Sequence, residues 1–279
     1  MKFAKFWKEI DVSVDKSFFG HTQVSIWGAS NDSNEDARNN AELRARKFEK
    51  LISSNSQSIQ DYEYWNGYIK EEVVEEILSS DGRLLAVLTR NSYGALVLNT
   101  ESVFFGDIDV VESNFITRIL EKFGKTKKDK AYYIEKVKDF QKMNQKYTIK
   151  VYETFAGLRI VIINQLFDSN SPEVSSIFSS LDTDPLYVML CKHQSCFRAR
   201  LSPKPWRVGI DRPKSRFPRS SQEKKDNFEK WLTNYKNVST NFGVTRLLKT
   251  YGADRSHSDV ERVMSIHDKY TFSVSRELA

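Results

Sequence analysis

The order of apolar runs between residues 102 and 202 constrains the fold of this chain more than any other feature. The runs predict strands at residues 102–110, 147–153, 158–164 and 197–202, and helices at residues 128–144 and 172–180. This order, strand–helix–strand–strand–helix–strand, is that of a ferredoxin-like or RNA-recognition-motif-like α+β unit. In such a unit the first strand lies between the third and the fourth and runs antiparallel to both.

The whole sequence predicts three parts, an N-terminal α/β extension, a core that contains this central order, and a C-terminal helical segment. These three parts are residues 1–60, 61–218 and 219–279. The further predicted elements are strands at residues 22–27, 84–89 and 95–98, and helices at residues 34–51, 70–78, 223–248 and 257–268.

Two aspartates end the first strand of the central order. Apolar residues precede them at 103–105, and Asp107 and Asp109 then stand two residues apart. Residues two apart on a strand point to the same face, so the two carboxylates are predicted to converge. Converging carboxylates repel each other unless a cation lies between them, and hard ions such as Mg²⁺ and Mn²⁺ prefer such oxygen ligands. The alternative is a strand that ends in a solvated acidic turn.

The predicted strand order brings other charged residues to the same sheet edge. The third strand begins near Arg159, the fourth begins near Arg198 and Arg200, and the loop with Asp182 and Asp184 returns to this edge. Carboxylates that hold a divalent ion beside arginines suit phosphoryl or nucleotidyl transfer. The predicted catalytic metal ligands are Asp107, Asp109 and Asp184. We prefer Asp184 to Asp182 because a proline fixes the chain after it.

A basic segment follows the last strand. Residues 198–225 hold ten basic and two acidic residues, a net charge of +8, whereas the whole chain carries +6. Four of the six prolines and two aromatic residues, Trp206 and Phe217, lie within it. A segment of this composition favours a surface for polyphosphate or nucleic acid over a merely soluble loop. The predicted phosphate contacts are Arg159, Arg198, Arg200, Lys204 and Arg207.

Three short stretches resemble motifs of the archaeo-eukaryotic primase superfamily, over roughly residues 83–207. Residues 105–109 look like its Asp-hydrophobic-Asp motif, residues 154–159 resemble its hairpin motif, and residues 181–187 with 197–204 are similar to its third motif and basic sequel. The resemblance implies a Mg²⁺- or Mn²⁺-dependent nucleotidyltransferase of the primase-polymerase type, acting on nucleoside triphosphates and DNA or RNA. Where the family has a histidine that contacts the triphosphate, this chain has Arg159, which cannot be a neutral acceptor.

Two other functions therefore stay open. One is a non-catalytic nucleic-acid-binding module on the same fold. The other is a metal-dependent nuclease or phosphohydrolase that uses the same acids to activate water.

The composition predicts the cellular environment of the protein. No stretch approaches about 20 apolar residues, so we expect no membrane partner, and the first residues lack the apolar region of a secretory signal. The two cysteines, Cys191 and Cys196, indicate a reducing, cytoplasmic environment and are predicted to be packing residues. Three scattered histidines, His21, His257 and His267, show no metal-binding spacing and are expected to be structural or surface residues.

Overall fold

A computed structural model describes residues 1–14, 22–53, 68–110, 128–272 and 277–279. It shows a mixed α+β fold whose larger sheets are antiparallel, which confirms the predicted class. The chain divides into two units, Met1–Glu71 and Glu72–Ala279. The predicted boundary near residue 60 lies outside the described residues.

The described residues of the first unit form an antiparallel strand pair and a helix. Its elements are β1 (Phe6–Ser13), β2 (Gln23–Ser30) and α2 (Asn34–Ser53). The strand and helix predicted in this region are confirmed, whereas β1 was not predicted. Apolar side chains between the strand pair and the helix form a small core of Val12, Ile26, Ala45 and Phe48.

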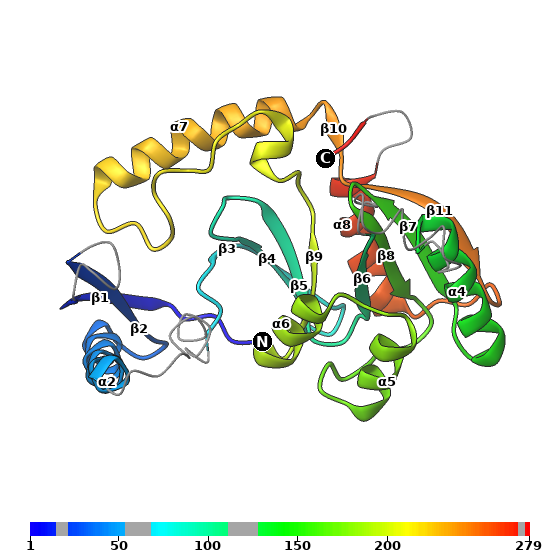
Figure 1. Cartoon of the computed structure of the whole chain (residues 1–279), viewed down its shortest axis with the longest axis horizontal. Coiled ribbons are helices and arrows are strands. Elements are labelled where there is room, and N and C mark those ends of the chain that lie inside the picture. Colours follow the sequence, from blue (N-terminus) through cyan, green and yellow to red (C-terminus); the bar gives the residue numbers. More distant parts are fainter. Residues whose placement is uncertain (15–21, 54–67, 111–127, 273–276) are drawn as a thin grey trace, which may run out of the picture. The chain divides into compact units, whose positions relative to one another are not determined.

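One sheet of the second unit carries the aspartate pair. Its strands, in spatial order, are β11 (Thr245–Tyr251), β7 (Ile149–Thr154), β8 (Gly157–Ile162) and β6 (Phe105–Asp109). As predicted, β6 runs antiparallel to β8, with Asp107 opposite Arg159 and Asp109 opposite Gly157. Helices α4 (Lys130–Met143) and α8 (Ser258–Thr271) lie on opposite faces of this sheet (Figure 1). Every residue of β8 is therefore buried.

A second sheet contains the last strand of the central order. Its strands, in spatial order, are β3 (Glu72–Leu78), β4 (Leu84–Arg90), β5 (Leu96–Thr100) and β9 (Phe197–Arg200). The strands predicted at residues 84–89 and 95–98 are confirmed. The helix predicted at residues 70–78 is wrong, because this segment is β3 and pairs with β4. The β-branched residues Val73, Val74 and Ile77 favour that extended conformation.

The ferredoxin-like strand order is not found. Strand β9 pairs with β5 rather than with β6. The hydroxyl of Tyr187, on α6 (Pro185–Gln194), lies between β6 and β9. It is 2.9 Å from the carbonyl oxygen of Phe105 and 3.0 Å from that of Arg198, and it accepts from the Arg198 amide at 3.3 Å. The tyrosine thus bonds backbone groups that a β6–β9 ladder would have used.

The C-terminal segment is only partly helical. Helix α7 (Gln222–Ser239) and helix α8 confirm two predicted helices, but residues 242–251 form β10 (Phe242–Gly243) and β11. Strand β11 pairs with β7 and so extends the sheet that carries the aspartates. A short strand β12 (Glu277–Leu278) pairs in parallel with β10.

Helix α5 (Pro172–Ser180) and the aromatic residues around Phe104 fill the interior beside β6. The Phe104 ring lies 5.2–5.5 Å, centroid to centroid, from the rings of Phe167, Phe178 and Phe197. Cys191 is also buried here, and burial raises the pKa of its thiol to about 12. Both cysteines are buried and neither forms a disulfide, as expected for packing residues. Within the described ranges, we find no helix long and apolar enough to cross a membrane.

Candidate functional site

Asp107 is held by a buried arginine from the neighbouring strand. The Nε of Arg159 donates to Oδ1 of Asp107 at 2.9 Å, and Nη2 donates to Oδ2 at 3.2 Å. The Arg159 side chain is 2% exposed, whereas that of Asp107 is 30% exposed. Burial alone would lower the pKa of Arg159, but the charge and hydrogen bonds of Asp107 reverse this and raise it. The pair is a bidentate, charge-assisted contact, and part of the Asp107 carboxylate remains accessible to solvent.

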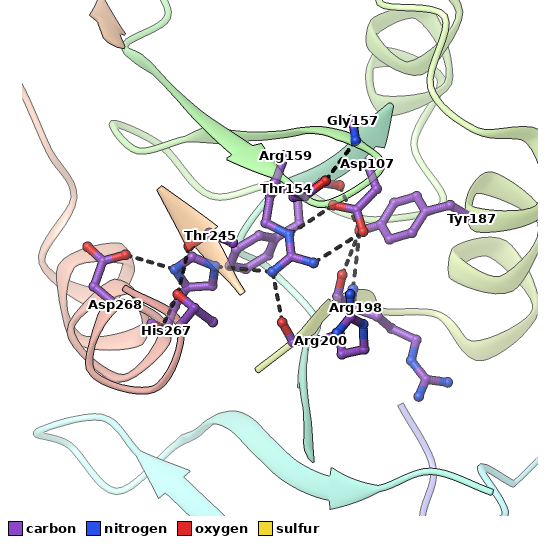
Figure 2. A network of polar contacts seen from close by, with 12 residues as sticks. Asp107, Thr154, Gly157, Arg159, Tyr187, Arg198, Arg200, Thr245, His267 and Asp268 are labelled. Carbon is purple, nitrogen blue, oxygen red and sulfur yellow. Dashed lines mark hydrogen bonds and ion pairs between the residues drawn. The ribbon is translucent and has the colours of Figure 1, made fainter. Parts of the chain in front are cut away.

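The rest of the Arg159 guanidinium is bonded on the side away from Asp107. Its Nη1 donates to the carbonyl oxygen of Arg200 at 3.0 Å and lies 3.2 Å from Nε2 of His267 (Figure 2). The sequence predicted that Arg159 contacts phosphate. The structure instead places it inside the protein, where it binds Asp107 and cannot reach a phosphate in solvent.

Asp109 differs from Asp107 in its side-chain contacts within the described residues. In the part of the chain that the structure describes, its exposed carboxylate has no hydrogen bond or ion pair. Its pKa is raised, first by the partial burial of the carboxyl and then by the negative charges of Asp184 and Asp107. Lys204 and Arg207 oppose this shift. Acids and cations therefore meet around this one carboxylate.

Asp184 joins the site through the backbone and caps a helix with its side chain. Its amide donates to the carbonyl oxygen of Asp107 at 2.9 Å. Its carboxylate accepts from the amides of Leu186 and Tyr187, at 3.3 and 3.1 Å, and so begins α6. The neighbouring Asp182 instead pairs with Lys136 at 2.6 Å. The backbone of Asp184 thus lies beside Asp107, while its carboxylate caps α6.

Four of the five predicted phosphate-binding residues come from β9 and the segment after it, and three of them are Arg200, Lys204 and Arg207. Lys204 precedes the short 3₁₀ helix η2 (Pro205–Val208), which contains Arg207. Burial lowers the pKa of Lys204, and the nearby charges of Arg207 and Arg200 lower it further. Arg200 donates to the carbonyl oxygen of Ser202 at 2.7 Å, and burial lowers its pKa to about 10. Lys204 and Arg207 both lower the pKa of the Asp109 carboxyl, whereas Arg200 is bonded to the backbone of its own segment.

Arg198 does not join this group. Its Nη1 donates to Oε1 of Gln194 at 2.5 Å, and Figure 2 shows its guanidinium directed away from Asp107 and Arg159. The prediction relied on β9 lying beside β6 in one ladder. Because β9 pairs with β5, its side chains take a different direction.

Exposed aromatic rings lie beside the cations. The guanidinium of Arg207 is 4.1 Å from the ring centroid of Phe155, which is 50% exposed in the β7–β8 turn. The guanidinium of Arg212 is 4.5 Å from the ring centroid of Trp206, which is 44% exposed, and the ring of Tyr93 meets that tryptophan at 5.2 Å. Aromatic rings alternating with arginines form surfaces on which bases stack. Phe155 was not singled out by sequence, because a lone exposed aromatic residue in a turn carries no pattern.

Gly157 allows β8 to approach β6 at this edge. A Cβ at this position would overlap the carbonyl oxygen of Ile108, so no other residue fits without a backbone shift. The glycine of the hairpin motif therefore has a direct role in placing Asp109 next to the β7–β8 turn.

The acids do not form a ready-made metal cage. Among the described residues, no three His, Cys, Asp or Glu side chains lie close enough together to hold a metal ion. Magnesium commonly binds one or two carboxylates together with substrate phosphates, while keeping several waters. The carboxylate of Asp109, which has no ion pair among the described residues, and the exposed part of the Asp107 carboxylate could serve as two such ligands.

Comparisons with protein-family models, curated proteins and solved structures returned no match.

Proposed function

We propose that the protein is a divalent-metal-dependent nucleotidyltransferase that acts on nucleoside triphosphates with a nucleic-acid partner. The observation that carries this proposal is the exposed Asp109 carboxylate, two residues from Asp107 on β6 and close to Asp184, whose amide donates to the Asp107 carbonyl oxygen at 2.9 Å. The charges of Lys204 and Arg207 also act on this carboxylate. A magnesium–triphosphate complex presents both a metal ion and phosphate oxygens, so it needs both kinds of group at one place. The resemblance of residues 83–207 to the primase superfamily supports the same reaction class.

The chain's residues have separate roles in this proposal. Asp109, with the accessible part of the Asp107 carboxylate, holds Mg²⁺ or Mn²⁺ that arrives with the nucleotide, and Asp184 adds negative charge beside them. Lys204 and Arg207 bind the phosphates. The metal ion would neutralise the charge that develops during transfer, while the fixed cations orient the reacting groups. Arg159 serves as an internal counter-ion.

A primer-extension experiment tests the proposal. A labelled single-stranded oligonucleotide is incubated with nucleotides and Mn²⁺, using the wild type, Asp109→Asn and Asp139→Asn. Asp139 is an exposed acid on α4 paired with Lys142, so it serves as a control for loss of one negative charge. We expect lengthened products from the wild type and Asp139→Asn and none from Asp109→Asn. Lengthening by Asp109→Asn at the wild-type rate would refute the proposal, and shortening would indicate the hydrolase.

The stacked aromatic and basic residues favour a second candidate, a nucleic-acid-binding module without catalysis. Phe155 with Arg207 and Trp206 with Arg212 form two ring–guanidinium stacks, and both rings are exposed. Each ring or guanidinium plane can stack an unpaired base, and the cations attract the phosphate backbone.

Fluorescence anisotropy of a labelled single-stranded oligonucleotide tests this binding surface, and the absence of lengthened products in the extension experiment separates this candidate from the first. If the protein only binds, affinity survives in Asp109→Asn but falls in Arg207→Ala and Trp206→Ala. The slope of log K against log salt should also decrease by about 0.7 when Arg207 loses one phosphate contact. Lys142→Ala, on the exposed face of α4, is the control for a lost surface charge. Unchanged affinity in both surface variants would exclude this binding surface.

A further inference from the structure

His267 is a histidine that the sequence did not connect with the aspartate pair. It lies on α8, is fully buried, and packs at ring-centroid distances of 5.5 Å from Phe105 on β6 and 5.2 Å from Tyr152 on β7. The ring therefore reaches the same face of the sheet as Arg159, from an element more than 100 residues away in sequence.

The partners of His267 determine where its ring proton lies. An arginine can only donate, so Nε2, 3.2 Å from Nη1 of Arg159, must accept. The proton of the neutral ring is then on Nδ1, which lies 2.8 Å from Oδ1 of Asp268. The other oxygen of Asp268 accepts from the Tyr152 hydroxyl at 3.3 Å. Each polar atom in this chain of contacts thus meets a complementary one.

We infer that His267 and Asp268 are positioning residues that hold the Arg159 guanidinium in the orientation in which it binds both oxygens of Asp107. Arg159 has five N–H donors, and its hydrogen-bond partners lie on two opposite sides, Asp107 on one and His267 with the Arg200 carbonyl on the other. A guanidinium fixed on both sides fixes the carboxylate that it binds. Helix α8 therefore sets the direction in which Asp107 presents the accessible part of its carboxylate.

The catalytic consequence of this inference rests on the proposed function. Residues that orient a metal-binding carboxylate typically change affinity or activity by about 10- to 100-fold when removed. The geometry itself is open to a test that needs no activity.

Two substitutions of His267 separate its two contacts. In His267→Gln the amide reaches the place of Nε2 and keeps an acceptor for Arg159. In His267→Asn the shorter amide reaches only the place of Nδ1, so Asp268 keeps a donor and Arg159 loses its acceptor. His257→Gln, at the N-terminal cap of the same helix, controls for loss of a histidine.

The first readout is the ¹⁵N NMR signal of the Arg159 Nε–H group, assigned by its loss in Arg159→Lys. We expect a sharp, protected signal in the wild type, His267→Gln and His257→Gln, and a broadened or exchanged signal in His267→Asn. The second readout is the kcat of transfer, which should fall about 10- to 100-fold in His267→Asn with KM for the nucleotide unchanged, and stay near wild type in His267→Gln.

The wild-type histidine ¹⁵N spectrum decides the matter even where His267→Asn does not fold, because it reports the ring tautomer directly. A proton on Nε2, or a His267→Asn variant that keeps both the Arg159 signal and the wild-type kcat, would overturn the inference. If the wild type shows no transfer but the Nε–H pattern and the Nδ1 proton are found, the positioning role stands and the proposed function fails.

Discussion

Asp107 and Asp109 occupy the same strand, two residues apart, yet the protein treats them in opposite ways. Asp107 is bound through both oxygens by Arg159, which is itself fixed by the Arg200 carbonyl and His267. Asp109 faces solvent with a raised pKa, caused by partial burial and by two neighbouring acids. The comparison teaches that one carboxylate contributes to the fold and the other is left for a ligand. Each prediction below contrasts these two ends of β6.

The largest effect is expected from Arg159→Met. Removing the buried cation leaves Asp107 without its counter-charge, and breaking such a pair costs about 3 kcal/mol or more in the free energy of unfolding. Urea denaturation measures the loss. The double variant Asp107→Asn/Arg159→Met should be more stable than the sum of the single variants predicts, because no uncompensated charge remains. Additive effects of the two substitutions would contradict a direct interaction between Arg159 and Asp107.

Gly157→Ala should destabilise the protein by about 1–3 kcal/mol, a range typical of overpacking. The new methyl group would push against the Ile108 carbonyl and separate β8 from β6 beside Asp109. Thermal unfolding followed by circular dichroism measures the change. Gly82→Ala is the control for added side-chain bulk, because a Cβ there meets no atom within 4 Å, although its positive φ of 83° adds a backbone cost. An effect no larger than in Gly82→Ala would mean that the close approach does not matter.

The pH dependence of stability should report on the buried end of the site. Burial lowers the pKa of His267, and the charge of Arg159 adds to this, while Asp268 opposes it. The unfolded chain therefore binds a proton at a higher pH, near 6.5, than the folded one does. Stability contributed by the neutral ring is present above pH 6.5 and is lost as pH falls below it, by at most about 1.4 kcal/mol per pH unit.

The measurement is a set of urea unfolding curves for the wild type and His267→Gln between pH 5 and 8. Groups facing the ring, Arg159 on β8, Tyr152 on β7 and Asp268 on α8, are the same in both proteins. The difference in the free energy of unfolding between the wild type and His267→Gln should therefore change with pH only as His267 titrates. Parallel curves over this range would show that the ring does not control stability.

The smallest effect on stability is expected from Asp109→Asn. Its exposed carboxylate makes no hydrogen bond or ion pair with any described residue, so the change should stay within about 0.5 kcal/mol. Any shift should be toward higher stability, because the substitution removes repulsion by Asp184 and Asp107. Chemical denaturation at pH 7 provides the number. A loss comparable with that of Arg159→Met would mean that both ends of β6 support the fold.

Local pattern predicted much of the sheet that carries the site. The alternation of β6 put Asp107 and Asp109 on one face, and the antiparallel pairing with β8 put Arg159 opposite Asp107. Sequence could not show that a tyrosine hydroxyl would separate β9 from β6, because that depends on the direction of one side chain from α6. For this reason the direction of Arg198 was missed.

The role of His267 could not be predicted either. It depends on a contact between α8 and β8 across 108 residues, and neither the helical pattern nor the spacing of histidines points to it. The sequence predicted a phosphate contact for Arg159, whereas the structure makes it an internal counter-ion, and the reason is the same. Arg159 is buried because helices cover both faces of β8, and this packing depends on contacts between distant parts of the chain.

The most direct test of the central claim is a Mn²⁺ titration followed by electron paramagnetic resonance, with a non-hydrolysable nucleoside triphosphate present. The account predicts that the wild type and Asp139→Asn bind Mn²⁺ beyond the amount held by nucleotide alone, and that Asp109→Asn does not. Equal Mn²⁺ binding by Asp109→Asn and the wild type would contradict it, as would a wild type that adds nothing to the nucleotide control.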